Sequence, residues 1–122
     1  QIITIPGPSA ILAALSISGV PTAGFIFLGF IPHKKGRETL FKEIKDLKRT
    51  VVFYESPHRI LKTLNSLSEI LKDEKDRKVS VAREMTKIFE ELVDGSAEEV
   101  LNYFQKNPEK VRGEFVVIVS YK

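Results

Sequence analysis

The sequence predicts an α/β layered domain, in which a mixed, largely buried sheet of about five strands is flanked by helices. Segments rich in β-branched and aromatic residues alternate along the chain with segments whose apolar residues recur at helical spacing. A length of 122 residues suits one domain with a real core. The 43% hydrophobic and 29% charged residues are typical of a globular protein.

The first part of the chain predicts two strands, each followed by a helix. Residues 2–5 (IITI) indicate a short strand that a Pro-Gly-Pro turn interrupts. A helix is expected from about Ser9, apolar nearly all round, with Gly19 as a natural stop. Residues 25–30 (FIFLGF) predict a buried strand, and residues 37–47 predict a helix with its charges on one face.

The middle of the chain contains the segment with the highest strand propensity. Residues 50–55 (TVVFYE) are β-branched or aromatic almost throughout. Ser56 fits a helix N-cap, and Pro57 suits the first helical position because its missing N–H is no loss there. The helix expected next carries one apolar stripe that ends at Leu71.

The last part predicts three further strands and one helix. Residues 78–84 indicate a strand, and residues 90–95 a shorter one. Ser96 and Glu99 form a capping box ahead of a final amphipathic helix. The apolar run within residues 113–121 predicts a strand that is buried on both faces.

Composition excludes several classes of site. The chain has no cysteine, which excludes disulfides, thiolate catalysis and cysteine-bound zinc. His33 and His58 are too few for a typical zinc site without carboxylates, and no metal is predicted. No window approaches the roughly 18 apolar residues of a membrane helix, and we expect a cytoplasmic protein. Because the chain does not open on methionine, we expect it to be a piece of a longer protein.

Positive charge is concentrated in one segment. Residues 33–49 contain seven basic and three acidic side chains, a net charge of +4 against +3 for the whole chain. Such a run is usually the solvated face of a helix. Lys34, Lys35 and Arg37 are expected to precede the helix, however, in a loop where they could follow a phosphate backbone.

Three stretches follow predicted strands and predict a ligand-binding edge. They are PGPSA at residues 6–10, YESPHR at residues 54–59 and REMTK at residues 83–87. Ligands of open α/β sheets bind outside the carboxyl ends of the strands. Each stretch also has a simpler interpretation. PGPSA could be only a tight turn, YESPHR could hold a surface ion pair between Glu55 and Arg59, and REMTK could be a solvated, charge-balanced turn.

His58 is expected in the first turn of a helix, beside the positive end of the helix dipole. That position favours the neutral imidazole, which suits hydrogen bonding or stacking as well as an ordinary surface position.

The order of these motifs resembles the C-terminal half of the tetrapyrrole (corrin/porphyrin) methylase family. The resemblance spans nearly the whole chain and rests on PGPSAILAALSISGVPT, FIFLGFIP, FYESPHRI, AREMTKIFEELVDG and GEFVVIV. FYESPHR, REMTK and the EE-x-x-x-G ending resemble the branch of the family that acts on ribosomal RNA.

The resemblance implies a two-domain enzyme that binds S-adenosylmethionine in the cleft between its halves and works as a homodimer. Residues 1–122 would be its C-terminal domain. The N-terminal domain, with its Gly-Asp-Ala-Gly and Ser-Asp-Pro-Gly motifs, is absent from this sequence. Much of the cofactor pocket would then be missing, and we do not expect catalysis by this chain alone. The implied partner is 16S rRNA or the small ribosomal subunit, and the implied reaction is 2′-O-methylation of a cytidine.

Residues are assigned roles by the matching motifs. The cofactor would contact Ser9, Ala10, Glu55 and Met85, with Glu114 and Phe115 near the adenine. Removal of the ribose hydroxyl proton needs a base, and the hypothesis is that Glu55, Glu84 or Glu91 serves as that base or orients it. The residues predicted to face RNA are Lys34, Lys35, Arg37, His58, Arg59, Arg83 and Lys87.

Two other functions stay open from the sequence. A relative acting on a small tetrapyrrole would need a broad apolar cleft, and the KKGR and SPHR stretches count against one. The second alternative is a module for dimerisation and RNA docking that carries no chemistry of its own.

Overall fold

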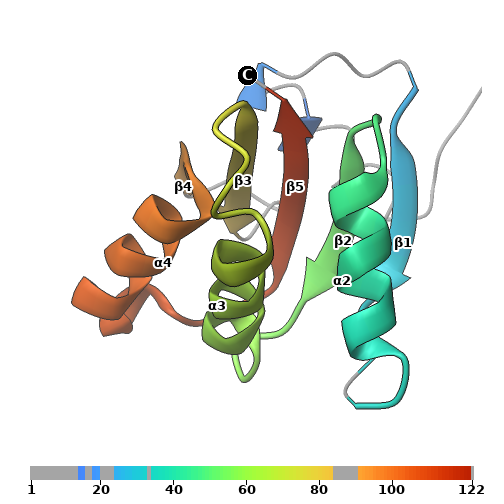
Figure 1. Cartoon of the computed structure of the whole chain (residues 1–122). Helices are drawn as coiled ribbons and strands as arrows, with labels where there is room; N and C mark the ends of the chain where they lie inside the picture. Colours follow the sequence, from blue (N-terminus) through green and yellow to red (C-terminus); the bar gives the residue numbers. More distant parts are fainter. Residues whose placement is uncertain (1–13, 16–17, 20–23, 33, 84–90, 122) are drawn as a thin grey trace, which may run out of the picture.

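A computed structural model of the chain describes residues 14–15, 18–19, 24–32, 34–83 and 91–121. Within these residues, five strands form one sheet in the order β1-β2-β5-β3-β4 (Figure 1). Strand β1 pairs with β2 in parallel, and the other three pairings are antiparallel. The predicted α/β class with a mixed sheet of five strands is therefore confirmed.

Within the described residues, the predicted order of elements is also observed. The strands are β1 (Ile26–Phe30), β2 (Val51–Glu55), β3 (Arg77–Arg83), β4 (Glu91–Gly95) and β5 (Phe115–Tyr121). The helices are α2 (Arg37–Asp46), α3 (Ile60–Ile70) and α4 (Ala97–Lys106), followed by the short 3-10 helix η1 (Pro108–Lys110). The strand expected at residues 2–5 lies outside the described residues.

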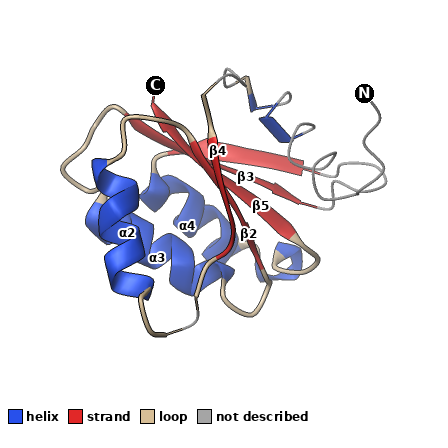
Figure 2. Cartoon of the chain, turned by 90° about the vertical axis from the view of Figure 1, so that its right-hand side faces the viewer, coloured by secondary structure: helices blue, strands red, loops and turns tan. Residues whose placement is uncertain are grey.

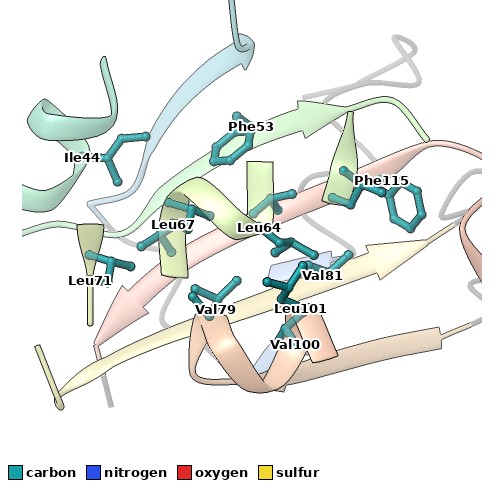
Figure 3. Close-up of a cluster of buried hydrophobic side chains, with 14 of the residues drawn as sticks. Ile44, Phe53, Leu64, Leu67, Leu71, Val79, Val81, Val100, Leu101 and Phe115 are labelled. Atoms are coloured by element: carbon teal, nitrogen blue, oxygen red, sulfur yellow. The ribbon is translucent and has the colours of Figure 1, made fainter. Parts of the chain in front are cut away.

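Helices α2, α3 and α4 cover one face of the sheet (Figure 2). The main core lies between these two layers, where Phe53, Val79 and Val81 of the strands meet Leu64 and Leu67 of α3 (Figure 3). Alternate residues of each strand point to this face. Strand β5 is buried on both faces over Phe115 to Ser120, as its apolar run predicts.

The opposite face of the sheet, here called the open face, carries a smaller cluster. Its buried members are Ala14, Leu15, Val52, Ala82, Val116 and Ile118. Ala14 and Leu15 are helical, in agreement with the helix expected in this region, although its predicted start at Ser9 lies outside the described residues. Gly19 has a φ of 77°, the left-handed conformation of a helix end.

Strand β1 departs from the prediction of a buried strand. It is an edge strand, with β2 as its neighbour in the sheet. Phe27 is 44% exposed and Phe30 is 57% exposed. Both rings lie on the open face, where no helix of the layer α2 to α4 covers them. An apolar sequence alone does not distinguish an edge strand from a central one.

The predicted N-cap at Ser56 is wrong. Helix α3 begins only at Ile60, and a turn closed by the Arg59 N–H on the Ser56 carbonyl oxygen (3.1 Å) precedes it. The Ser56 hydroxyl caps no helix, and its backbone N–H donates to Glu55 Oε1 at 2.9 Å. The preceding carboxylate thus engages the serine's main chain. The capping box of Ser96 and Glu99 at the start of α4 is confirmed.

The topology brings three strand ends together. Since β5 is antiparallel to both β2 and β3, those two strands are parallel to each other and to β1. Their carboxyl ends therefore lie at one edge, here called the carboxyl edge, beside the amino ends of β4 and β5. Two of the three stretches predicted to form a ligand edge, those that follow β2 and β3, begin at this edge, whereas PGPSA lies outside the described residues.

Candidate functional site at the carboxyl edge

Four residues at the carboxyl edge lie in one row across the sheet. Glu55 pairs with Phe115, Phe115 pairs with Arg83, and Arg83 pairs with Glu91. Residues paired in register project to the same face. Phe115 belongs to the core under the helices, so the two carboxylates also point toward the helical layer.

Glu55 is fully buried and its carboxylate is hydrogen-bonded on both oxygens. Oε2 accepts from the Thr63 hydroxyl of α3 at 2.6 Å. Oε1 accepts from the Ser56 N–H and lies 3.4 Å from Arg59 Nε. The interpretation of Glu55 and Arg59 as a surface ion pair is therefore wrong, because the acid is inaccessible to water. A buried charge needs such partners to offset its lost hydration.

Arg37 extends this set of contacts to the loop after β1. Its Nη2 donates to the Thr63 hydroxyl at 2.8 Å, and its Nη1 donates to the Pro32 carbonyl oxygen at 3.3 Å. The Thr63 hydroxyl thus accepts from Arg37 and donates to Glu55. We call Glu55, Ser56, Arg59, Thr63 and Arg37 the Glu55 network.

The position of Arg37 contradicts its assignment to a phosphate-binding loop. It is the first residue of α2 and only 7% exposed, with its guanidinium 4.9 Å from the centre of the Phe41 ring. Burial lowers the pKa of Arg37, the charge of Glu55 raises it, and the charge of Arg59 lowers it. The guanidinium joins the loop after β1 to α3 instead of lying open to solvent.

Glu91 is the second carboxylate of the row and forms what we call the Glu91 network. It accepts from Arg83 Nη2 at 3.3 Å and from the Tyr103 hydroxyl of α4, and it lies 3.4 Å from Lys110 Nζ. Strands β3 and β4 are thereby linked to α4 and η1.

The contacts of Glu91 change its acidity. Desolvation would raise the pKa of Glu91, but the Tyr103 hydrogen bond and the charge of Lys110 outweigh it and lower the pKa overall. The bond to Glu91 in turn raises the pKa of Tyr103. A carboxylate with a lowered pKa is a weaker base than a free one.

The other predicted site residues divide into two groups. Lys34, Lys35 and His58 are exposed, Arg59 is half-buried, and Arg83 is paired with Glu91. The remaining five predictions, Ser9, Ala10, Glu84, Met85 and Lys87, lie outside the described residues.

Sequence reasoning missed Thr63 and Tyr103. Thr63 lies on the buried stripe of α3, three residues after Ile60, and is itself fully buried. A hydroxyl at a core position, following a strand that ends in a carboxylate, was a usable signal. Tyr103 gave no comparable signal, because its contact with Glu91 depends on how α4 packs on β4.

Two polar side chains, Tyr54 and Glu114, lie at the carboxyl edge outside the two carboxylate networks. Tyr54 precedes Glu55 and therefore points to the open face. Glu114 lies two residues before Val116, the register partner of Tyr54, and is exposed. Burial and the charge of Glu114 both raise the pKa of Tyr54. The exposed carboxylate of Glu114 can accept hydrogen bonds from the hydroxyls of an adenosyl group, so this residue fits part of S-adenosylmethionine.

The sequence profile of Tetrapyrrole (Corrin/Porphyrin) Methylases matches residues 1–101 of the chain. The chain belongs to this family. Two methylase structures have the same fold: the methyltransferase CobJ, with a TM-score of 0.64 and 22% identity, and the cobalt precorrin-4 methyltransferase CbiF, with 0.61 and 15%. Each superposition covers 91% of the chain, and 47% and 48% of the respective structure.

Closer sequence similarity connects the chain to relatives named "Ribosomal RNA small subunit methyltransferase I". The relative from Thermotoga maritima is 44% identical over 118 residues, which cover 97% of this chain and 51% of that protein. The relative from Halalkalibacterium halodurans is 43% identical over 120 residues, 98% of this chain and 40% of that protein. The chain thus spans about half, or less, of the length of these relatives.

None of the helices in the described part of the chain is long and apolar enough to cross a membrane.

Proposed function

We propose that this chain is the C-terminal domain of an S-adenosylmethionine-dependent methyltransferase that methylates the 2′-hydroxyl of a cytidine in 16S rRNA. The observation that carries the proposal is the 44% identity, over 97% of the chain, to a relative named for small-subunit rRNA methylation. We further propose that the enzyme is a cytoplasmic homodimer acting on the small subunit or its rRNA.

The cofactor would supply a methyl group bound to a sulfonium ion. We assign its binding to Ser9, Ala10, Met85 and the main chain at the end of β2, with Glu114 near the adenosyl group. Two observations support the last residue: Glu114 is exposed, and it lies at the carboxyl edge, directly before β5. The other domain of the enzyme would complete the pocket.

Methyl transfer to a ribose hydroxyl requires the oxygen to be aligned with the methyl group and its proton to be removed. Alignment lowers the barrier by fixing both groups before reaction. Of the three proposed bases, Glu55 is buried beneath α3, and Glu91 has a lowered pKa. We therefore assign proton removal to Glu84, and we assign positioning roles to Glu55 and Glu91.

The Glu55 network supports such a positioning role. Arg37 ties the loop after β1 to Thr63, and Glu55 ties the same hydroxyl to the turn after β2. These two segments carry exposed Lys34, Lys35 and His58, which we propose contact RNA phosphates. The network would hold the cationic side chains at a set separation.

The test uses the full-length protein with tritiated S-adenosylmethionine and small ribosomal subunits from a strain that lacks the modification. We expect label in 16S rRNA, on a ribose. Label in a tetrapyrrole acceptor, with none in the RNA, would instead favour the small-molecule reaction. If neither acceptor is labelled while the cofactor binds, the proposed acceptor class is wrong.

The assignment of the base has its own test. Glu84→Gln should lower kcat at least a hundredfold while leaving cofactor affinity within about twofold. Glu38→Gln, at an exposed position of α2, is the matched control and should leave kcat unchanged. Full activity of Glu84→Gln would remove Glu84 as the base.

A further inference from the structure

Two large apolar side chains of β1 are exposed, Phe30 at the carboxyl end of the strand and Phe27 near its amino end. Phe27 and Phe30 of β1 are the exposed large hydrophobic residues of the described part of the chain. Their ring centres lie 5.3 and 5.2 Å from the ring of Tyr54, with interplanar angles of 77° and 47°. The three rings form what we call the aromatic cluster, on the open face.

A β-bulge places both phenylalanines on the same face. Phe27 pairs with Val52 and Phe30 pairs with Tyr54, so three steps along β1 match two steps along β2. In a regular strand, residues three apart point to opposite faces. Gly29 makes the bulge possible with a φ of 73°. Without the bulge, Phe30 would turn from the open face toward the helices.

The surroundings of the aromatic cluster suit an unpaired nucleic acid. Strand β1 leads directly into the loop with Lys34 and Lys35, and β2 leads into the turn with His58, all three exposed. Glu114 is the acidic group beside Tyr54. Proteins that bind single strands combine cationic side chains for the phosphates with aromatic rings on which bases stack. A purely apolar protein interface would not need cations on both adjoining segments.

We propose that the aromatic cluster is a stacking platform for an unpaired base next to the methylated nucleotide, with Lys35 and His58 on the adjoining phosphates. The inference rests on the proposed function and adds the contact that would select a single-stranded target. Phe30, as the most exposed ring, would carry most of the stacking.

The test compares Phe30→Ala, Phe30→Leu and Phe30→Tyr in the full-length protein. The probe is a short single-stranded RNA containing 2-aminopurine, whose fluorescence is quenched when the base stacks. The alanine and leucine variants should bind it about tenfold more weakly and lose the quenching, whereas tyrosine should keep both. With small subunits as substrate, KM should rise about tenfold for alanine and leucine at nearly unchanged kcat.

Leucine is the decisive variant because it keeps apolar surface and lacks a ring. If Phe30→Leu binds and quenches like the wild type, stacking is overturned. If Phe30→Ala instead converts a dimer to monomers and weakens RNA binding only through that change, the cluster is an interface between copies, and the inference is also overturned.

Gly29→Ala gives a second test that leaves every ring in place. A Cβ at Gly29 would meet no atom within 4 Å, so the substitution acts through its unfavourable positive φ. We expect it to flatten the bulge and reduce the quenching; unchanged quenching would contradict the role of the bulge.

The two proposals fail separately. A wild-type protein that quenches the probe but transfers no methyl group to rRNA would overturn the proposed function and keep the platform. One that methylates rRNA but leaves the probe unquenched would overturn only the platform.

Discussion

Glu55 and Glu91 lie in the same row of the sheet and face the same helical layer, yet their environments differ. Glu55 is 0% exposed, and its closest partners are a hydroxyl and a backbone N–H. The Glu91 side chain is 18% exposed and is surrounded by Arg83, Lys110 and the Tyr103 hydroxyl. Residue type and row are therefore not enough to set the properties of a carboxylate.

The position of the strand explains the difference. Strand β2 lies between β1 and β5, under α3, whereas β4 is an edge strand. A carboxylate on an inner strand loses water and depends on fixed hydrogen bonds. On an edge strand such as β4, long cationic side chains can reach the carboxylate from the solvent side, as Lys110 does. We expect the Glu55 network to contribute more to the stability of the fold than the Glu91 network.

Glu55→Gln should have the largest effect. It removes the charge that faces Arg59 and favours ionised Arg37, and we expect it to lower the free energy of unfolding by about 3 kcal/mol. Urea denaturation measures the change. Glu38→Gln, at an exposed position, should change stability by less than about 0.5 kcal/mol. Equal effects of the two substitutions would contradict the claim that the buried Glu55 carboxylate contributes more to stability than an exposed one.

Thr63→Val should follow, at about 2 kcal/mol. Valine matches the shape of threonine, but Glu55 loses a donor and Arg37 loses an acceptor within the core. The matched control is Thr39→Val on the exposed side of α2. Comparable destabilisation by Thr39→Val would show that the hydroxyl of Thr63 contributes nothing particular.

Glu91→Gln should lower stability by only about 1 kcal/mol at neutral pH. Because folding lowers the pKa of Glu91, its ionised form contributes stability above the ordinary carboxyl pKa. This contribution is lost as the pH falls through the lowered pKa of the folded state. The difference between wild type and variant should therefore shrink in acid, below about pH 4. Thermal unfolding from pH 7 to 3 measures it, and a constant difference would contradict the assignment.

Tyr103→Phe should have the smallest effect, about 0.5 kcal/mol, because it removes one partly exposed hydrogen bond to Glu91. It should also raise the pKa of Glu91 toward its ordinary value. A double-mutant cycle with Glu91→Gln tests whether the two effects are coupled. Full additivity would mean that the hydroxyl does not act through Glu91.

Local sequence patterns predicted the elements well but not their exposure. The capping box of Ser96 and Glu99 involves atoms close in the chain, and it is present. At Ser56 the same reasoning failed, because the Glu55 carboxylate engages the serine's backbone N–H and the helix starts later. The apolar letters of β1 were compatible with a central strand, and its position at the edge left Phe30 exposed.

The candidate site, too, was predictable in its location but not in the burial of its residues. Its location after β2 and β3 follows from a general property of α/β sheets and was predictable. The burial of Arg37 was not, because it depends on Thr63, a residue 26 positions away in the chain. The sequence alone does not distinguish basic residues in an exposed loop from basic residues whose side chains are buried.

By itself, the sequence determined the order of the described strands and helices, the family, and the ends of β2 and β3 as parts of the carboxyl edge, since each depends on local periodicity or on contiguous motifs. Only the tertiary structure decided which face each side chain occupies and which charges are buried. Those properties arise from the register of paired strands and from the packing of α3 and α4. Register and packing join residues far apart in the chain, and local patterns carry little information about such contacts.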